Sequence, residues 1–528
     1  MEADNSSIMI SYITTVLIGV LTTQAFLWAL LRCSQDANEP PTVDTAIPFI
    51  SALARMGWKG LRYWGEHSDL PIYTVRLPGF RLYIVNSTAL IPIVQRRVRT
   101  ISFSPIMVQM AARYMAVSKE AFEIISRDPI DSHGFVAGMN KTTHIDLSPG
   151  PQLDSLNEKS IQVLLASLSQ AAMGDTKVSM RQWIDREITM ATTDAIYGPS
   201  NPFRDPDITT AWLKYEAGLL PLLVNILPMF TAREPAGARE VLVQAYEAYY
   251  RQGGHSNASA FIKHRCEFYL QRGIPFADIA RIEVGAAIGL ISNSKPAAFW
   301  LLYHICSDST LLSICREELS KGVQVRDEGS ECIVDMTYIK SSCPVLFSTF
   351  KEVFRVHGMG IAIRQIIEDE MLDNRILLKK NSFLLIPADV QHKLRTIWGQ
   401  DANSFNYNRF IHECNSSNKS SSKRDKRVNP VAFRGFGGGS TLCPGRHFAA
   451  TEILAFVSLV ILRFDIKPLS GQWAMPTVKR SKPGIALHQP DNDIEIELIP
   501  RDTGKMRWLV KFSGSKGPMG VSAEDLDE

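Results

Sequence analysis

Residues 434–449 of this 528-residue chain read RGFGGGSTLCPGRHFA, in which three consecutive glycines precede one cysteine and a Pro-Gly pair. Glycines adopt backbone conformations closed to other residues and let a neighbouring group approach closely. Pro444 suits the first turn of a helix, and the apolar run that follows predicts a helix over 446–464. Loop N–H groups and a helix N-terminus both stabilise a thiolate. The segment predicts a thiolate metal ligand at Cys443 or, equally well by composition alone, a buried inert cysteine.

The glycine run does not fit a nucleotide-binding loop, because no Lys-Ser/Thr pair follows it and no strand leads into it. The cysteines are scattered, with no CxxC pair and no Cys/His set that has the spacing of a zinc site. In a chain of this length, that pattern fits a reducing compartment better than a disulfide framework. The eight cysteines are Cys33, Cys266, Cys306, Cys315, Cys332, Cys343, Cys414 and Cys443.

The remaining sequence is that of an ordinary globular protein, with 45% hydrophobic and 21% charged residues. Its formal net charge of +3 gives no indication of nucleic-acid binding. Length alone allows two or three domains or one large fold.

Helical periodicity dominates the body of the chain, whereas strand-like alternation is confined to short stretches. Residues 72–87 alternate around Pro78-Gly79 and predict a hairpin, and residues 375–388 predict a second strand pair. Residues 412–430 predict a solvated loop, and the chain after Arg501 is expected to be frayed. Helices are predicted over 178–198, 278–308, 345–358 and 446–464. The fold class is therefore mostly α with small β-sheets.

The amino-terminal stretch from Asn5 to Leu31 contains no charged residue. Its apolar core is long enough to cross ~30 Å of hydrocarbon at 1.5 Å per residue. Acidic residues precede the stretch and Arg32 follows it, so charge bias places the amino end in the lumen and the body in the cytosol. We therefore expect a single-pass transmembrane anchor over 1–33, followed by a Pro-containing linker. A signal peptide with an atypical start is the alternative.

Phe436, Gly439, Cys443 and Gly445 stand in the pattern F-x-x-G-x-x-x-C-x-G, and Ala449 follows at a further fixed distance. This pattern resembles the haem-binding loop of the cytochrome P-450 superfamily, and its five positions at fixed spacing make it specific. The resemblance implies that Cys443 is the thiolate axial ligand of the iron of haem b. Such a thiolate donates electron density and thereby favours O–O cleavage.

The same resemblance implies the cytochrome P-450 fold plus one N-terminal transmembrane helix. The expected organisation is an anchor over 1–33, a haem-thiolate catalytic domain over 34–500 and a C-terminal tail over 501–528.

Glu352 and Arg355 lie three residues apart and so share one helix face. By themselves they read as a surface ion pair worth under ~1 kcal/mol. They precede Cys443 where the family carries its E-x-x-R pair, and residues 392–410, HKLRTIWGQDANSFNYNRF, resemble the family segment that ends in a second arginine, here Arg409. The resemblance implies that the glutamate joins both arginines in a structural role. The usual proline of that segment is replaced by Asn408.

Arg364 falls where the family places a haem-propionate arginine, although a solvated strand arginine is the alternative. Two positions before Cys443, where many members have a second such arginine, this chain has Thr441. An early W-x-x-x-R helix is also not evident. The resemblance therefore implies that Arg364 carries more of the propionate binding than it does in most members.

The long apolar helix predicted over 278–308 has the polar centre GLISNSKPAAFW. Most monooxygenase members carry an acid–threonine pair there, which delivers protons to iron-bound dioxygen; Asn293 and Ser294 replace it here. Pro296 removes a backbone hydrogen bond, so a simple kink is the alternative. The centre, with the CPGRHFA run, is similar to the branch of sterol 7α- and 12α-hydroxylases, prostacyclin synthase and fungal biosynthetic enzymes. The Ser294 hydroxyl favours monooxygenation over isomerisation.

The resemblance implies a monooxygenase of the endoplasmic reticulum membrane, with its catalytic domain in the cytosol. It would take electrons from NADPH through NADPH-cytochrome P-450 reductase and oxidise a small hydrophobic substrate. The substrate class expected is a terpenoid-, sterol- or polyketide-like intermediate of secondary metabolite biosynthesis. The basic run from Lys423 to Arg427 is either a reductase-docking surface or a solvated loop.

Two alternatives to a monooxygenase stay open. The first is an isomerase or dehydratase of the same fold that acts without a reductase. The second is a helical membrane protein in which Cys443 only packs.

Overall fold

The computed structural model describes residues 2–174, 176–225, 227–326, 330–411, 429–481, 484–513, 520–522 and 524–526. The chain divides into two compact units. Unit 1 comprises Met1–Phe103 and Ile361–Gln391, and unit 2 comprises Ser104–Gly360 and His392–Glu528. Most of the loop predicted over 412–430, with the basic run Lys423–Arg427, lies outside the described residues.

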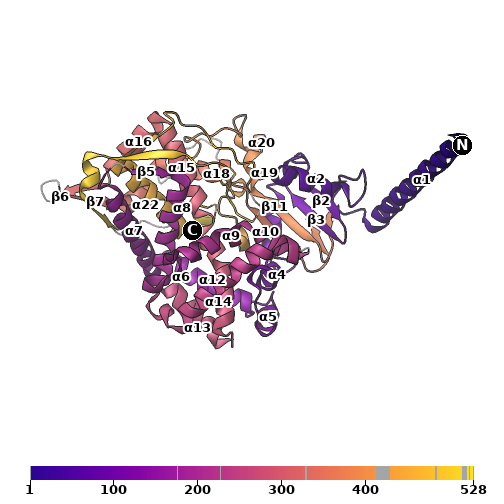
Figure 1. Cartoon of the computed structure of the whole chain (residues 1–528), viewed down its shortest axis with the longest axis horizontal. Coiled ribbons are helices and arrows are strands. Elements are labelled where there is room, and N and C mark those ends of the chain that lie inside the picture. The colour runs from indigo at the N-terminus through magenta and orange to yellow at the C-terminus, as the bar shows by residue number, and fades with distance from the viewer. Residues whose placement is uncertain are drawn as a thin grey trace. The chain divides into compact units, whose positions relative to one another are not determined.

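Unit 1 is built on a small sheet with the strand order β1-β2-β3-β11-β8-β4 (Figure 1). The predicted hairpin over 72–87 is confirmed, since β2 and β3 pair antiparallel around Gly79, whose φ of 83° suits glycine alone. Unit 1 contains helices α1 Glu2–Ser34, α2 Ser51–Lys59 and α3 Leu90–Arg96, with α19 Ala388–Lys393 at its boundary. Its strands are β1 Thr42–Val43, β2 Ile72–Leu77, β3 Phe80–Val85, β4 Ile101–Ser102, β8 Ile361–Ile366, β9 Glu370–Leu372, β10 Ile376–Leu378 and β11 Phe383–Pro387.

The second strand pair, predicted over residues 375–388, has the right strands but the wrong pairing. Strands β10 and β11 both form within residues 375–388, but they do not pair with each other. Strand β10 pairs with β9, whereas β11 pairs with β8 on one side and β3 on the other. The sequence showed two short apolar runs close together, and local spacing carries no information about a partner that lies elsewhere in the chain.

Helix α1 covers the residues predicted to form a membrane anchor. Residues Met9–Ser34 form a candidate span of 26 residues, with an 18-residue window that has mean hydropathy 1.7 and no residue buried in the protein. The helix extends away from the sheet of unit 1 (Figure 1) and leaves side chains such as Ile10, Val16 and Leu21 more than half exposed. At its other end, Ser34 accepts hydrogen bonds from Arg76 and Arg81 on the sheet. A long apolar helix with no protein covering fits a membrane anchor.

Unit 2 is mostly helical, and two small sheets of three strands lie at its edges. Its helices are α4 Ser104–Met110, α5 Lys119–Ser126, α6 Phe135–Leu147, α7 Pro151–Ala171, α8 Met180–Tyr197, α9 Pro206–Ala217, α10 Leu219–Val224, α11 Pro228–Thr231, α12 Arg233–Arg251, α13 Ala260–Gln271, α14 Phe276–Ile291, α15 Ser294–Ser307, α16 Ser309–Ser320, α17 Met336–Ser342, α18 Pro344–His357, α20 Arg395–Trp398 and α22 Arg446–Arg463. Its strands are β5 Thr176–Ser179, β6 Val323–Arg326, β7 Glu331–Asp335, β12 Phe464–Pro468, β13 Glu495–Pro500 and β14 Arg507–Lys511.

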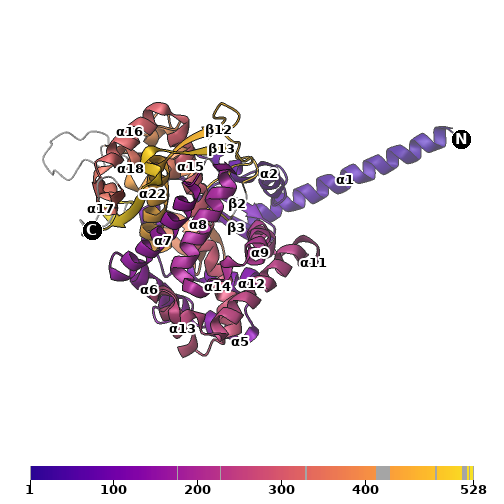
Figure 2. The ribbon, with the colours of Figure 1, turned by 60° about the vertical axis from the view of Figure 1, so that its left-hand side comes forward.

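Helix α22 runs through the larger of two hydrophobic clusters in unit 2 and packs against α7, α8 and α15 (Figure 2). It follows the glycine-rich loop directly, and its apolar residues, such as Ile453 and Phe456, are fully buried. The second cluster joins α9, α12, α13 and α14. The loop that holds Cys443 is therefore anchored at one end by a core helix.

The predicted helices over 178–198, 345–358 and 446–464 are confirmed as α8, α18 and α22. The predicted helix over 278–308 is interrupted at Ser292 and Asn293, which separate α14 from α15. The tail after Arg501 was predicted to be frayed, and that prediction is wrong for its described part. Strand β14 pairs in parallel with β7, and Val521 is fully buried.

Glu452 in α22 is 1% exposed and accepts hydrogen bonds from the hydroxyls of Ser160 and Thr192, at 2.7 and 2.8 Å. Burial raises the pKa of this carboxyl from 4.5 to about 7. Because the folded-state pKa is the higher one, its stabilising contribution is complete below about pH 4.5 and is lost as the pH rises to about 7. We expect Glu452→Gln to remove this pH dependence and to raise the thermal midpoint above about pH 7, measured from about pH 5 to 8. Glu158→Gln, at an exposed position of α7, is the matched control. An unchanged slope in Glu452→Gln contradicts the prediction.

Candidate functional site

The glycine-rich loop turns back on itself before Cys443. Gly437 has a φ of 82°, and a Cβ there would lie 2.5 Å from the carbonyl oxygen of Thr441, so glycine is required. The Cys443 N–H donates to the carbonyl oxygen of Phe436 at 2.9 Å, which closes the turn. Gly439 has a φ of 56° and begins a short 3-10 turn, Gly439–Thr441. The loop thus fixes Cys443 just before the first turn of α22.

Cys443 differs from the buried cysteines in exposure. Among the described cysteines, five are buried and Cys443 is only half-buried, although it lies beside a core helix. The N–H of Gly445 donates a hydrogen bond toward its sulfur. Burial raises the pKa of the Cys443 thiol, whereas this hydrogen bond and the Arg446 guanidinium act to lower it. The residue is therefore partly exposed, and the Gly445 N–H and the Arg446 guanidinium offset part of the effect of burial on its thiol.

Phe436 forms an aromatic wall beside this sulfur-bearing loop. Its ring stacks on Phe354 of α18 at 4.5 Å between centroids, and Phe350 stacks on it from 6.3 Å. Phe350 and Phe354 are buried, whereas Phe436 is partly exposed. A partly exposed ring held by buried rings suits a flat aromatic ligand.

Glu352, Arg355 and Arg409 meet as the sequence predicted. The Glu352 carboxylate is fully buried and accepts two hydrogen bonds from Arg355, both at 2.7 Å, and one from Arg409 at 3.2 Å. The backbone N–H of Asn406 donates to it at 2.9 Å. Arg409 also binds Asp401 at 2.8 Å. This is a buried network, and the surface ion pair considered from the sequence is wrong.

His392 extends the network to the loop, a role that the sequence did not reveal. Arg355 donates to the carbonyl oxygens of His392, Ala402 and Ser404 at 2.8, 2.6 and 2.9 Å. The His392 ring nitrogen Nε2 in turn accepts the N–H of Arg434 at 2.9 Å. Burial lowers the pKa of His392 to about 3, so the ring is a neutral acceptor. Helix α18 is thereby connected through residues 392–409 to the start of the glycine-rich loop.

Asn293 and Ser294 lie at the break between α14 and α15. The Asn293 side-chain oxygen accepts the N–H of Ala486 at 2.7 Å, so this residue positions a distant chain segment. Ser294 is 6% exposed, and its hydroxyl makes no hydrogen bond to any residue that the structure describes. The sequence treated the two as a pair, but the Asn293 side-chain oxygen is engaged with Ala486, whereas no described residue binds the Ser294 hydroxyl.

The next residue, Lys295, is buried in a charge cluster that the sequence did not predict. Its ammonium lies 3.2 Å from the carboxylate of Glu216 at the end of α9. Both side chains are less than a tenth exposed. Burial raises the pKa of nearby Asp185 in α8 to about 6, with Lys295 acting in the opposite direction. The cluster ties the helix break to α8 and α9.

Arg364 lies in β8 of unit 1 and is fully buried, which excludes the solvated strand arginine. The other predicted site residues belong to unit 2. Thr441, where many members have arginine, turns its hydroxyl to the carbonyl oxygen of Gly438 at 3.0 Å. The Thr441 hydroxyl therefore stabilises the turn of the loop.

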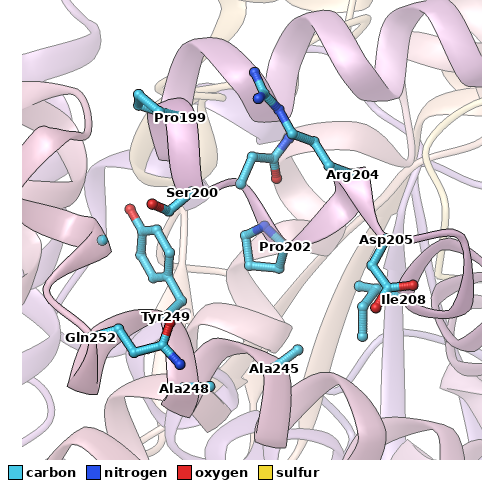
Figure 3. A pocket seen from close by; sticks show the side chains of 12 residues that line it. Pro199, Ser200, Pro202, Arg204, Asp205, Ile208, Ala245, Ala248, Tyr249 and Gln252 are labelled. Carbon is cyan, nitrogen blue, oxygen red and sulfur yellow. The ribbon is translucent and has the colours of Figure 1, made fainter.

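A surface pocket forms elsewhere in unit 2, between residues 199–208 and helix α12 (Figure 3). Tyr249, Gln252 and Arg204 line it, and none of the predicted site residues does so. Arg204 is paired with Asp194 at 2.9 Å, and Asp205 caps α9. These polar groups are used by the fold, so the pocket is not the candidate site.

The donor set at Cys443 fits haem. Within the described residues, no three His, Cys, Asp or Glu side chains form a cluster that could hold a metal ion. A single partly exposed cysteine suits a metal whose other ligands come with it, as in a porphyrin. The partly exposed Phe436 ring and the Gly445 N–H complete a site for a flat, thiolate-ligated group.

Comparison with known proteins decides the family. The family model described as "Cytochrome P450" matches residues 292–496, which include the helix break and the loop. A cytochrome P450 monooxygenase, nodJ, of Hypoxylon pulicicidum is 32% identical over 521 residues, covering 96% of this chain and 99% of that protein. The chain belongs to the cytochrome P450 family. This P450 is also 27% identical over 451 residues to a cytochrome P450 monooxygenase of Gibberella zeae, with 83% of each chain covered.

A third relative connects this P450 to the 7A branch. Cholesterol 7-alpha-monooxygenase of Cricetulus griseus is 24% identical over 502 residues, which cover 89% of this chain and 95% of that protein. Fungal P450 monooxygenases and this sterol enzyme together confirm the branch predicted from the helix centre and the CPGRHFA run. The protein is thus an oxidoreductase of a family that uses haem iron. The alternative of a membrane protein in which Cys443 only packs is wrong.

Proposed function

We propose that the chain is a membrane-anchored haem-thiolate monooxygenase that oxidises a hydrophobic intermediate of secondary metabolism. One observation carries the proposal: a half-exposed cysteine, Cys443, is held by a glycine loop at the start of a core helix. When bound, haem iron supplies the activation of dioxygen. The balanced reaction is R–H + O₂ + NADPH + H⁺ giving R–OH + H₂O + NADP⁺.

Each predicted residue then takes a role. Cys443 would hold the haem iron through its thiolate, Phe436 would pack against the porphyrin, and Gly439 and Gly445 give the loop its shape. Arg364 would bind a haem propionate. Glu352, Arg355 and Arg409 hold the loop in place.

We assign the break between α14 and α15 to proton delivery during oxygen activation. Ser294 presents a hydroxyl that can hold and pass a proton, since no described residue binds it. Asn293 positions the segment at Ala486. The acid of the usual acid–threonine pair is absent, so proton delivery relies on the serine and on water.

Localisation and electron supply follow from the anchor and the family. Helix α1 fits a single membrane span, which we assign to the endoplasmic reticulum with the catalytic domain in the cytosol. NADPH-cytochrome P450 reductase in the same membrane would supply the two electrons. A substrate that partitions into lipid can then enter beside the bilayer.

The substrate class rests on the relatives. One relative is named for a reaction at carbon 7 of cholesterol, and others are fungal monooxygenases. We infer a terpenoid-, sterol- or polyketide-like substrate, hydroxylated at an unactivated carbon.

The alternative is a P450-fold isomerase or dehydratase, which needs no electrons. We expect product formation from a panel of terpenoids, sterols and polyketides only when NADPH, reductase and dioxygen are all present. Liquid chromatography with mass spectrometry should find a mass gain of one oxygen, and ¹⁸O₂ should label it. Conversion of a substrate or a lipid peroxide without NADPH contradicts the proposal and supports the isomerase. Reactions that omit the reductase alone serve as the control.

A further inference from the structure

The C-terminal segment, described at residues 520–522 and 524–526, contacts the loop that carries Cys443 and the start of α22. Asp525 is buried, and its carboxylate binds the Arg446 guanidinium at 2.6 and 2.9 Å. The His447 ring nitrogen Nε2 lies 3.4 Å from the same oxygen. Arg446 and His447 are the third and fourth residues after Cys443. The segment therefore neutralises charge next to the sulfur.

A second carboxylate of the segment binds the glycine run itself. Glu524 accepts the N–H of Gly439 at 2.8 Å. It also acts electrostatically on Arg434, a loop arginine that is 5% exposed. The Arg434 nitrogen Nη2 is buried and has no hydrogen-bond partner among the described residues. Burial lowers the pKa of Arg434 to about 10, and Glu524 counteracts this.

The segment is built to present these carboxylates. The N–H of Ser522 donates to Asp525 at 2.9 Å, and the Ser522 hydroxyl accepts the Asp525 N–H. Val521 is fully buried, which anchors the segment by an apolar side chain. The hydrogen bonds that the Glu524 and Asp525 carboxylates accept are charge-assisted, and such bonds are about twice as strong as neutral ones. Asp525 thus binds Arg446 and lies near His447 at the start of α22, whereas Glu524 binds the preceding loop and acts electrostatically on Arg434.

We propose that Glu524 and Asp525 act as an intramolecular acidic ligand that competes with the acidic surface of the electron-donor protein for the basic residues of this loop and of the start of α22. This inference rests on the proposed function. Basic residues around a thiolate ligand would attract an acidic partner and speed its encounter. A tethered acid has a high effective concentration at the same site, so the partner must displace it. The segment would thereby lower the apparent affinity for the donor protein.

The test measures the rate of the first electron transfer from the reductase to the haem, which can be followed without a known substrate. Full-length protein with bound haem is mixed with NADPH and increasing NADPH-cytochrome P450 reductase under carbon monoxide, and the rate of appearance of the reduced CO-bound spectrum is followed. We expect Asp525→Asn and a chain ending at Gly520 to lower the half-saturating reductase concentration by about tenfold. The rate should also become more sensitive to salt. Asp502→Asn, at an exposed position of the same terminal region, is the matched control and should behave as the parent.

The outcomes separate this inference from the proposed function. A normal dithionite-reduced CO spectrum with an unchanged or increased half-saturating concentration in Asp525→Asn overturns the inference alone. Loss of haem in Asp525→Asn and in Glu524→Gln also overturns it, because the segment would then be a structural part of the haem site. Absence of a thiolate-type spectrum in the parent protein would refute the proposed function itself.

Discussion

Replacing Cys443 with alanine is expected to abolish the red-shifted Soret band of the reduced, CO-bound protein. That band requires a thiolate that holds the haem iron, and no other described cysteine lies in the loop. Full loss of the band is expected, together with a large loss of bound haem. The measurement is a reduced-plus-CO difference spectrum with a haem assay on the purified protein.

Two further variants distinguish ligation from folding. Cys33→Ala makes the same chemical change at an exposed position of α1 and should leave the spectrum unchanged. Cys443→His should retain some haem and move the band to the position of a nitrogen-ligated haem. A parent-like band in Cys443→Ala would contradict the assignment of this residue.

The loop could be predicted from the sequence because its information is local. Phe436, Gly439, Cys443 and Gly445 lie within ten positions of one another, and each has a physical requirement that only a few residue types meet. Helix α22 was equally clear, since its apolar residues form one continuous run. The Glu352–Arg355 pair needed the family spacing to be noticed, because an i, i+3 ion pair is commonplace on helix surfaces.

Long-range partners were not predictable in the same way. Asp525 binds Arg446 across 79 positions, and Asn293 binds Ala486 across 193. The tail is rich in small and charged residues and so reads as solvated, although two of its acids, Glu524 and Asp525, contact the loop and the start of α22. Strand β10 was recognised while its partner β9 was missed. Local composition reports what a segment can form, whereas the partner depends on the whole fold.

Glu352→Gln is expected to cost about 3–5 kcal/mol of stability, because it removes the charge that compensates two buried guanidinium groups. Arg355 and Arg409 would keep their positions against backbone carbonyls but lose the shared carboxylate. Since this network continues through His392 to Arg434, the loop around Cys443 should loosen as well. We expect a markedly lower thermal midpoint and less bound haem per chain, measured by calorimetry and a haem assay.

The matched control for this change is Glu317→Gln. Glu317 forms an i, i+4 pair with Lys321 at 3.0 Å, but both side chains are more than half exposed. Such pairs contribute about 0–1 kcal/mol, so this variant should keep the parent midpoint and haem content. The two substitutions are chemically identical and differ only in burial and in the number of partners. If Glu352→Gln proved as mild as Glu317→Gln, the buried network would not be what holds the loop, and the position of Cys443 would have to depend on the packing of α22 and Phe436 alone.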